Sequence, residues 1–245
     1  MTRFENDTQY KGFITQSFDM AWLNQLSVGH VDPETDETVF LSDERWSDVV
    51  NNWVRFYEIA GNEFTETSFS RVKNSFYGAQ VAAMYAYYFP TDEQEVNGVN
   101  WDIVRLPEFA DRPGVGPQFR MDLAFIMSTS EHKDDAFKAI TVLTEDPFQR
   151  ELSESGRGLP VSSNQEIKDI FGQGNPVLEG KNVGTLLEIE PAENFPITPY
   201  SWDANALFES KMYELGRGEM DVNTFLRAVG EEVTSRIEEI KASEE

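Results

Sequence analysis

Residues 81–90, VAAMYAYYFP, place four aromatic side chains within five positions. The segment begins with small and branched apolar residues, as a buried strand does, and Pro90 ends it. Successive side chains of a strand point to opposite faces, so some of the rings at Tyr85, Tyr87, Tyr88 and Phe89 are expected in a core. The others could form a flat surface that serves another purpose, and the residues themselves leave these two interpretations open.

The sequence lacks the usual patterns of catalytic, cofactor and metal sites. It contains no G-x-S-x-G nucleophile motif and no phosphate-binding P-loop, and a G-x-G start at Gly172 has Val177 where a third glycine is needed. His30 and His132 are far apart, without the close spacing of a metal-binding pair, and we expect both on the surface. We therefore expect a protein that is not an enzyme and has no cofactor or metal.

Two other functional classes stay open at this point. A carbohydrate hydrolase uses a pair of carboxylates, but 44 acidic residues guarantee some pairing by chance, so this pattern carries little weight. A purely structural or protein-binding role is the other alternative, and it predicts that no aromatic ring is exposed for a ligand.

The charge of the chain excludes several kinds of partner. Its 245 residues include 20 basic and 44 acidic ones, a formal net charge of −24, which argues against nucleic acid and against anionic membrane surfaces. The absence of cysteine excludes disulfides and thiolate metal sites. The first residues, MTRFENDTQYKGF, are too polar for a signal peptide, and no apolar run is long enough to span a membrane.

One acidic stretch, HVDPETDETVFLS, invites a calcium-binding interpretation. An EF-hand loop that began at Asp32 would need glycine at its sixth position and glutamate at its twelfth, where this sequence has Glu37 and Asp43. We therefore predict a turn that leads into a short strand, residues 38–41.

Apolar periodicity predicts several helices. The clearest covers residues 43–60, where one apolar stripe recurs at helical spacing, with Ser42 and Gly61 as caps. The stripe consists of Trp46, Val49, Val50, Trp53, Val54 and Tyr57. Further helices are expected over residues 68–77, from Ser130, from Thr144 to Gly156, and over residues 201–215 and 221–241.

Strands are predicted between these helices. Residues 101–107, WDIVRLP, and residues 121–128 have the branched and aromatic residues of strands, a Pro/Gly loop covers residues 111–116, and residues 157–200 are mostly loop. Since strands and helices alternate, the fold class is α/β or α+β.

The order of these elements carries a resemblance to a known family. Residues 101–109, WDIVRLPEF, are followed by a Pro/Gly loop, by MDLAFIMSTS and by a helix with Ala136-Phe137, Ile140 and Val142-Leu143. Asp146, Gln149 and the segment Gly158-Leu159-Pro160-Val161 complete the pattern. Over residues 10–242 the chain resembles the sugar-binding lipoproteins of bacterial ABC importers, which are similar to maltose-binding protein. It departs from the family pattern at Ala79 and Ala83, where glycine and methionine are usual.

The resemblance implies an α/β fold of the type II periplasmic-binding-protein class. Such proteins have two lobes that clamp a ligand, and this chain would supply essentially one: residues 1–127 plus 175–245 would form the C-terminal lobe. Residues 130–170 would cross the hinge and pack on an absent N-terminal lobe. We expect the N-terminal lobe, the signal peptide and the lipid-anchor cysteine to precede Met1 in a longer parent. Phe137, Ile140 and Phe148 would then be exposed, and residues 131–165 could mediate self-association.

The resemblance also implies a function and a set of site residues. The chain would be the substrate-binding component of a carbohydrate importer, binding a sugar or oligosaccharide without catalysis. A membrane permease would be the partner of the full-length protein, which would be extracellular or periplasmic and lipid-anchored. The ligand-binding residues would be Tyr87, Tyr88, Phe89, Asp122 and Trp202. Rings would stack on the apolar faces of pyranose, and Asp122 would accept hydrogen bonds from its hydroxyls.

Overall fold

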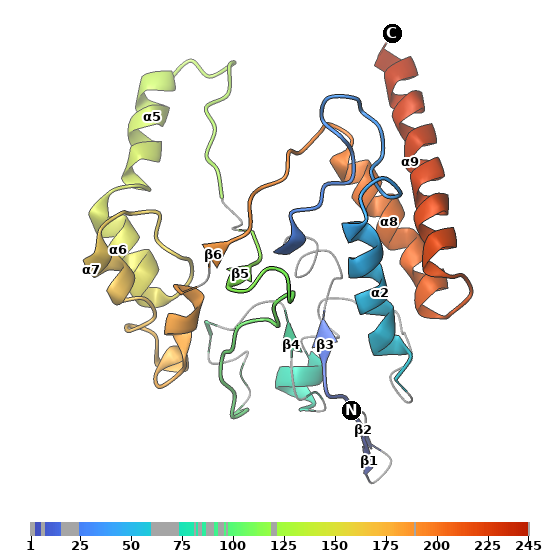
Figure 1. The fold of residues 1–245 in the computed structure, drawn as a ribbon. Coiled ribbons are helices and arrows are strands. Elements are labelled where there is room, and N and C mark those ends of the chain that lie inside the picture. Colours follow the sequence, from blue (N-terminus) through green and yellow to red (C-terminus); the bar gives the residue numbers. More distant parts are fainter. Residues whose placement is uncertain are drawn as a thin grey trace. The chain divides into compact units, whose positions relative to one another are not determined.

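The computed structural model describes residues 3–5, 8–15, 25–59, 74–80, 82, 85–86, 91–92, 96, 98–118, 122–188 and 190–244. These residues belong to two units (Figure 1). Unit 1 consists of Met1–Tyr87, Val115–Gln118 and Pro191–Glu245, and unit 2 of Tyr88–Gly114 and Phe119–Glu190. The predicted division into a lobe of residues 1–127 plus 175–245 and a hinge-crossing segment of residues 130–170 stays a prediction.

The described strands are short and pair two by two. In the described part of the chain, β1 (Arg3–Glu5) pairs with β2 (Thr8–Tyr10), β3 (Ile14–Thr15) with β4 (Tyr85–Ala86), and β5 (Val115–Gly116) with β6 (Glu190–Pro191). The β3–β4 pair is parallel, and a parallel bridge between Lys11 and Ala82 continues the same register. This confirms an extended strand at the start of the aromatic segment, at Ala82, Tyr85 and Ala86.

Three long helices build unit 1. They are α2 (Arg45–Tyr57), α8 (Ser201–Gly216) and α9 (Val222–Glu244), and each packs against the other two. Trp46, Val49, Val50 and Trp53 are buried on α2, so the predicted stripe is indeed its core face. On α9 the buried residues Phe225, Leu226, Val229, Val233 and Ile237 recur at helical spacing. The three helices predicted from periodicity are therefore confirmed to within a few residues.

An aromatic cluster fills the space between these helices. Phe40 lies 4.7 Å from Trp46 between ring centroids, Trp46 lies 5.0 Å from Phe208, and Phe208 lies 5.1 Å from Phe225. All four rings are essentially inaccessible to solvent. Tilted and edge-on contacts at such distances stabilise aromatic pairs by about 0.5–1.5 kcal/mol beyond the burial of their area.

His30 lies in the same cluster, which corrects the expectation that it is on the surface. Its ring centroid is 5.2 Å from that of Trp46 and 5.9 Å from that of Phe40, and it is only 7% exposed. Neither ring nitrogen has a hydrogen-bond partner in the described part of the chain. Burial therefore lowers the pKa of His30 to about 4, although the nearby Asn205 side chain raises it in part. His132 is exposed, as expected.

A tight turn joins α8 to α9. Gly218 adopts a left-handed conformation, with φ of 72°, and its N–H donates to the carbonyl of Leu215 at 2.9 Å. The N–H of Glu219 donates to the carbonyl of Glu214, which completes a Schellman motif. Asp221 then caps α9, because its Oδ1 accepts the backbone N–H groups of Asn223 and Thr224.

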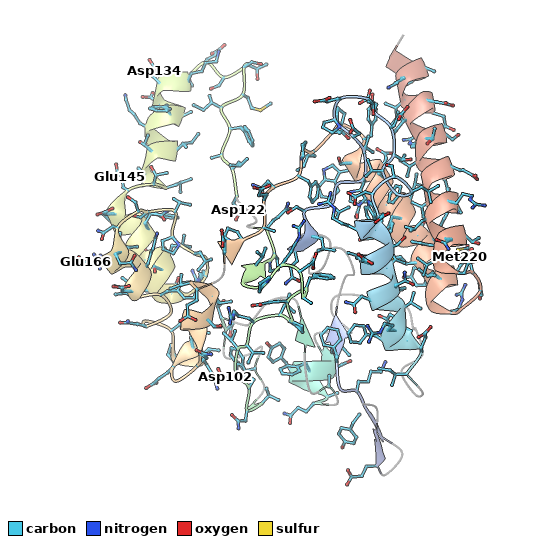
Figure 2. The ribbon with its side chains drawn as sticks, viewed as in Figure 1. Asp102, Asp122, Asp134, Glu145, Glu166 and Met220 are labelled. Atoms are coloured by element: carbon cyan, nitrogen blue, oxygen red, sulfur yellow. The ribbon has the colours of Figure 1, made fainter. Side chains whose placement is uncertain are left out.

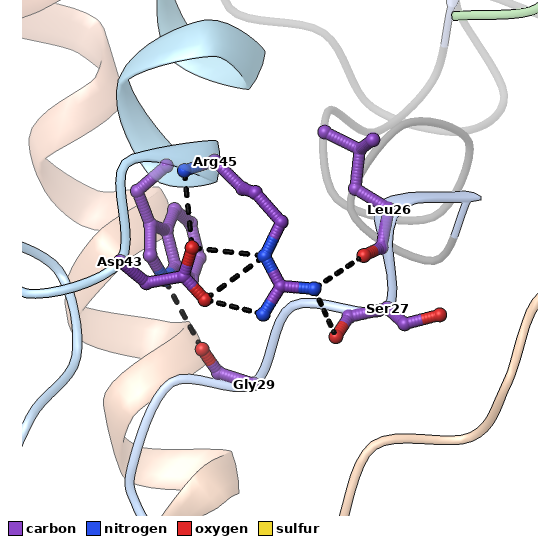
Figure 3. A network of polar contacts seen from close by, with 6 residues as sticks. Leu26, Ser27, Gly29, Asp43 and Arg45 are labelled. Atoms are coloured by element: carbon purple, nitrogen blue, oxygen red, sulfur yellow. Dashed lines mark hydrogen bonds and ion pairs between the residues drawn. The ribbon is translucent and has the colours of Figure 1, made fainter. Parts of the chain in front are cut away.

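An arginine fixes the start of α2 (Figure 3). The Nε of Arg45 donates to Asp43 at 2.9 Å, and its Nη1 donates to the carbonyls of Leu26 and Ser27 at 2.9 and 3.4 Å. The indole N–H of Trp46 donates to the carbonyl of Gly29 at 3.1 Å. These contacts take the place of the predicted Ser42 cap, and the predicted Gly61 cap lies outside the described residues.

The acidic stretch folds back on itself as predicted. Oδ1 of Asp32 accepts the backbone N–H groups of Glu34 and Thr35, which also lowers the pKa of its carboxyl. The predicted strand over residues 38–41 is wrong, because it is reduced to a single antiparallel bridge between Val31 and Thr38.

Unit 2 is built from shorter elements. These are α5 (Lys133–Val142), α6 (Asp146–Ser155), α7 (Gln165–Asp169) and two 3₁₀ turns, Pro176–Leu178 and Val183–Leu186. Ile167, Phe171 and Leu178 form its small core. Ser153 is fully buried; its hydroxyl donates to the carbonyl of Ile167, and its own carbonyl accepts the N–H of Gly172 at 2.8 Å. Gly156 must be glycine, because it has φ of 68° and a Cβ would lie 2.3 Å from Leu178.

Two predicted strands of unit 2 are absent from the described structure. Residues 101–107 and 122–128 have no strand assignment and no ladder partner among the described residues. The prediction of Ser130 as helix cap is also wrong: α5 begins at Lys133, and the Ser130 hydroxyl accepts the N–H of His132 at 3.2 Å. The predicted helix over residues 144–156 is confirmed as α6, which ends at Ser155 with Gly156 as its C-cap.

The burial of His30 predicts a loss of stability in acid. An unfolded chain binds a proton at His30 near pH 6.5, whereas the folded chain resists protonation until about pH 4. The contribution of His30 is therefore fully present above pH 6.5 and is lost as pH falls toward 4, by about 3 kcal/mol in total. Urea unfolding of the wild type, His30→Phe and the surface control His132→Ala between pH 7 and 4 measures this loss. We expect this acid-induced loss of stability to disappear in His30→Phe and to remain in His132→Ala. If the stability of His30→Phe fell with pH in parallel with that of the wild type, the loss could not be assigned to His30.

Candidate functional site

Trp202 is the most exposed large apolar side chain in the described structure, with 81% of its surface accessible. It lies in the first turn of α8, whose buried face consists of Ala204, Phe208, Met212 and Leu215. Successive residues of an α-helix are rotated by about 100°, so Trp202 and Ala204, two positions apart, lie about 200° apart around the helix axis. Trp202 therefore points away from the buried face, of which Ala204 is the first residue. The exposure of its ring therefore follows from the packing of α8.

A network of hydroxyl groups fixes the chain just before Trp202. The N–H of Thr198 donates to the Ser201 hydroxyl at 2.9 Å, and the N–H of Ser201 donates back to the carbonyl of Thr198 at 3.1 Å. Tyr200, between them, is buried, and the Nζ of Lys241 lies 5.6 Å from its ring centroid. An exposed tryptophan is thus carried on a rigid turn, and little conformational entropy of the backbone would be lost on binding.

Polar groups lie beside the tryptophan. Asp203 accepts a hydrogen bond from Nε of Arg236 on α9 at 2.8 Å, and Arg236 also contacts Glu239. The bond to Asp203, followed by that to Glu239, raises the pKa of the Arg236 guanidinium. Ile197, 75% exposed, adds apolar surface to the segment that precedes α8. An exposed tryptophan whose neighbour in the chain holds a guanidinium is a combination that can bind a polyhydroxylated ring.

The described structure does not test whether the other predicted ligand-binding residues share this surface. Tyr87, Tyr88 and Phe89 lie outside the described residues. Asp122, labelled in Figure 2, is described and exposed. It belongs to unit 2, whereas Trp202 belongs to unit 1. The grouping of these residues with Trp202 therefore stays a prediction.

Sequence reasoning missed Ile197, Asp203 and Arg236. Asp203 and Arg236 are 33 positions apart, and only the packing of α9 on α8 brings them together. A signal for Ile197 was available, since it stands in a run of turn residues, FPITPYSW, where no core position is expected.

The described part of the chain contains neither a cluster of metal-binding side chains nor a helix that could span a membrane. Among those residues no group of three or more His, Asp or Glu side chains could hold a metal ion. No helix of the same described residues is long and apolar enough to cross a bilayer.

Comparison with known proteins gives one informative result. No protein-family model matches the chain, and no curated protein matches it in sequence. Among solved structures, it is similar to the maltose/maltodextrin-binding domain MalE from Bdellovibrio bacteriovorus bound to maltotriose, with a TM-score of 0.63 and 16% identity. The match covers 95% of this chain and 62% of that chain. It shows that this chain has the fold of a solute-binding protein, as expected from its sequence, and that it spans 62% of the length of that neighbour.

The contrast between two tryptophans tests the assignment of Trp202. Trp53 is 2% exposed in the core of unit 1, so Trp53→Ala should lower the free energy of unfolding by about 3–5 kcal/mol. Trp202 is 81% exposed, so Trp202→Ala should change that free energy by less than about 0.5 kcal/mol. Urea unfolding of both variants measures the difference. Unfolding of unit 1 by Trp202→Ala would mean that this ring is a core residue.

Proposed function

We propose that this chain is the substrate-binding component of an ABC-type carbohydrate importer and binds a sugar or oligosaccharide without catalysis. The solute-binding-protein fold supports the proposal, because a solved structure with that fold is a maltose/maltodextrin-binding domain bound to maltotriose. The observation that carries the proposal to particular residues is the exposure of Trp202 on a rigid turn.

The chemistry of Trp202 suits a carbohydrate better than other small solutes. A pyranose ring has apolar C–H faces and a polar rim, so a flat aromatic face can cover the first while neighbouring polar groups bind the second. Asp203 accepts and Arg236 donates hydrogen bonds, which gives the site both functions that a hydroxyl needs. In this proposal Tyr87, Tyr88, Phe89 and Asp122 contribute further contacts to the same ligand.

The remaining part of the binding site is proposed to lie outside this chain. The chain matches 62% of its structural neighbour. Two-lobed binding proteins gain affinity by closing around their ligand, and one lobe supplies only part of the contacts and no enclosure. We therefore expect a half-site in this chain. A membrane permease as partner, and an extracellular or periplasmic, lipid-anchored full-length protein, are parts of the same proposal.

Weak sugar binding by this chain is the direct test. We expect a dissociation constant of millimolar or weaker for maltotriose and related oligosaccharides, which corresponds to about −4 kcal/mol or less favourable. Saturation-transfer NMR detects such binding, and Trp202→Ala should abolish the signal whereas Trp202→Phe should keep part of it. Leu41→Ala is the matched control, because it removes another exposed apolar side chain of unit 1.

Two results would contradict this proposal. No saturation transfer to any sugar of the panel, or an undiminished signal in Trp202→Ala, would show that this surface is not the binding site. Micromolar binding by the 245-residue chain would contradict the half-site, because it would require an enclosed ligand.

A further inference from the structure

His30 is a buried side chain that the proposed sugar site does not use. It is 7% exposed, and its ring centroid lies 5.2–6.5 Å from those of Trp46, Phe40, Phe208 and Phe195. Neither ring nitrogen has a hydrogen-bond partner in the described part of the chain. Buried polar groups of native proteins are nearly always paired, so an unpaired imidazole in a core calls for an explanation.

Asn205 of α8 is the polar side chain that His30 faces. It lies close enough to raise the pKa of His30 in part, but the contact falls short of a hydrogen bond. Oδ1 of Asn205 is buried and likewise has no partner among the described residues. Its Nδ2 donates instead to Oε1 of Glu209 at 3.3 Å, which is longer than most N–H···O bonds. Asn205 therefore stands between a buried titratable group and an exposed carboxylate.

Helical geometry places Asn205 next to Trp202. Residues three and four positions apart are neighbours on an α-helix, so Trp202, Asn205 and Glu209 follow one another along one side of α8. Seven positions bring Met212, which is buried, to within about 20° of Asn205 around the helix axis. Asn205 thus lies at the border between the core face of α8 and the side that carries Trp202, so a change at His30 can reach that surface.

No other ionisable side chain of the described residues shifts the pKa of His30, on which only burial and the Asn205 side chain act. The ionisable residues nearest along the chain to His30 and to the four rings around it are Asp32, Glu37, Asp43, Glu44, Arg45, Asp48, Glu193 and Glu209. The two that lie closest to these rings on helices bond elsewhere: Arg45 pairs with Asp43, and Glu209 accepts from Asn205. A proton taken up by His30 would therefore find Asn205 as its acceptor.

We propose that protonation of His30 draws the Asn205 side chain away from Glu209 and so changes the side of α8 that carries Trp202. Both ring nitrogens of an imidazolium donate hydrogen bonds, and Oδ1 of Asn205 is an unused acceptor beside them. Neutral His30 makes no such demand, and Asn205 then keeps its bond to Glu209. A proton that enters the core is in this way detected at the surface.

The consequence for ligand binding rests on the proposed sugar site. A ligand that binds this side of α8 while His30 is neutral opposes protonation, and linkage makes the two effects reciprocal. Sugar should therefore bind more weakly as pH falls through the pKa of His30, about 4. Saturating sugar should in turn lower that pKa further.

An aspartate at position 205 tests the coupling without any ligand. NMR titration follows the ring protons of His30 and the indole N–H of Trp202, whose signal is identified by its loss in Trp202→Ala. In Asn205→Asp a carboxylate beside the imidazole should raise the pKa of His30 by about 1 or more, and the midpoint of the Trp202 response should rise with it. Asn51→Asp adds the same charge at an exposed position of α2 and should move neither midpoint.

Two further variants identify the cause, because exposed carboxylates also titrate in acid. His30→Phe in the Asn205→Asp background should remove the raised midpoint at Trp202. Asn205→Ala, a milder change, should remove the part of the Trp202 response that follows His30. Different midpoints for His30 and Trp202 in Asn205→Asp, or a Trp202 response that His30→Phe leaves unchanged, would overturn the coupling.

Saturation transfer to maltotriose at pH 7 and pH 4 tests the consequence for the ligand. We expect a signal at least twofold weaker at pH 4 in the wild type and equal signals at both pH values in His30→Phe. Equal signals in the wild type would contradict acid control of sugar binding. No signal at either pH would contradict the proposed function itself, whereas the NMR titration alone decides the coupling of His30 to Trp202.

Discussion

The aromatic cluster of unit 1 is the constraint on which the candidate site depends. Its rings come from four different segments: Phe40 from the loop before α2, Trp46 from α2, Phe208 from α8 and Phe225 from α9. Because Phe208 cannot leave the cluster without opening a cavity, the rotation of α8 about its axis is fixed. That rotation determines which side chains of its first turn face outward. The exposure of Trp202 is thus a consequence of core packing on the opposite face of the same helix.

The sequence predicted helices well because their periodicity records burial. The stripe of α2 and the apolar face of α9 are visible from residue types alone, and both face the core. Details that depend on contacts distant in sequence were missed. The Asp43–Arg45 pair and the carbonyls of Leu26 and Ser27 fix the start of α2, where a serine cap was expected. A buried histidine with a pKa of about 4 was likewise unpredictable, since only the surrounding rings desolvate it.

Strands were predicted less well because an apolar run indicates burial without naming a partner. In the aromatic segment, β4 pairs with β3, which lies 71 positions earlier in the chain. The register of this pair cannot be read from the residues of either strand. Residues 101–107 and 122–128 have the composition of strands but are not paired in a β-ladder with any of the described residues. The candidate site shows the same limit: the outward direction of Trp202 follows from helical geometry, whereas the position of Arg236 beside Asp203 follows only from helix packing.

The two units differ in how completely they bury their own apolar residues. Of the fourteen large apolar side chains exposed in the described structure, ten belong to unit 2. Unit 1 closes a core among three long helices, so its stability depends chiefly on its own contacts. Unit 2 has only Ile167, Phe171, Leu178 and a few neighbours as a core, and α5 buries nothing. Since burial of apolar area is the dominant stabilising term in folding, unit 2 gains more than unit 1 from any surface that covers it.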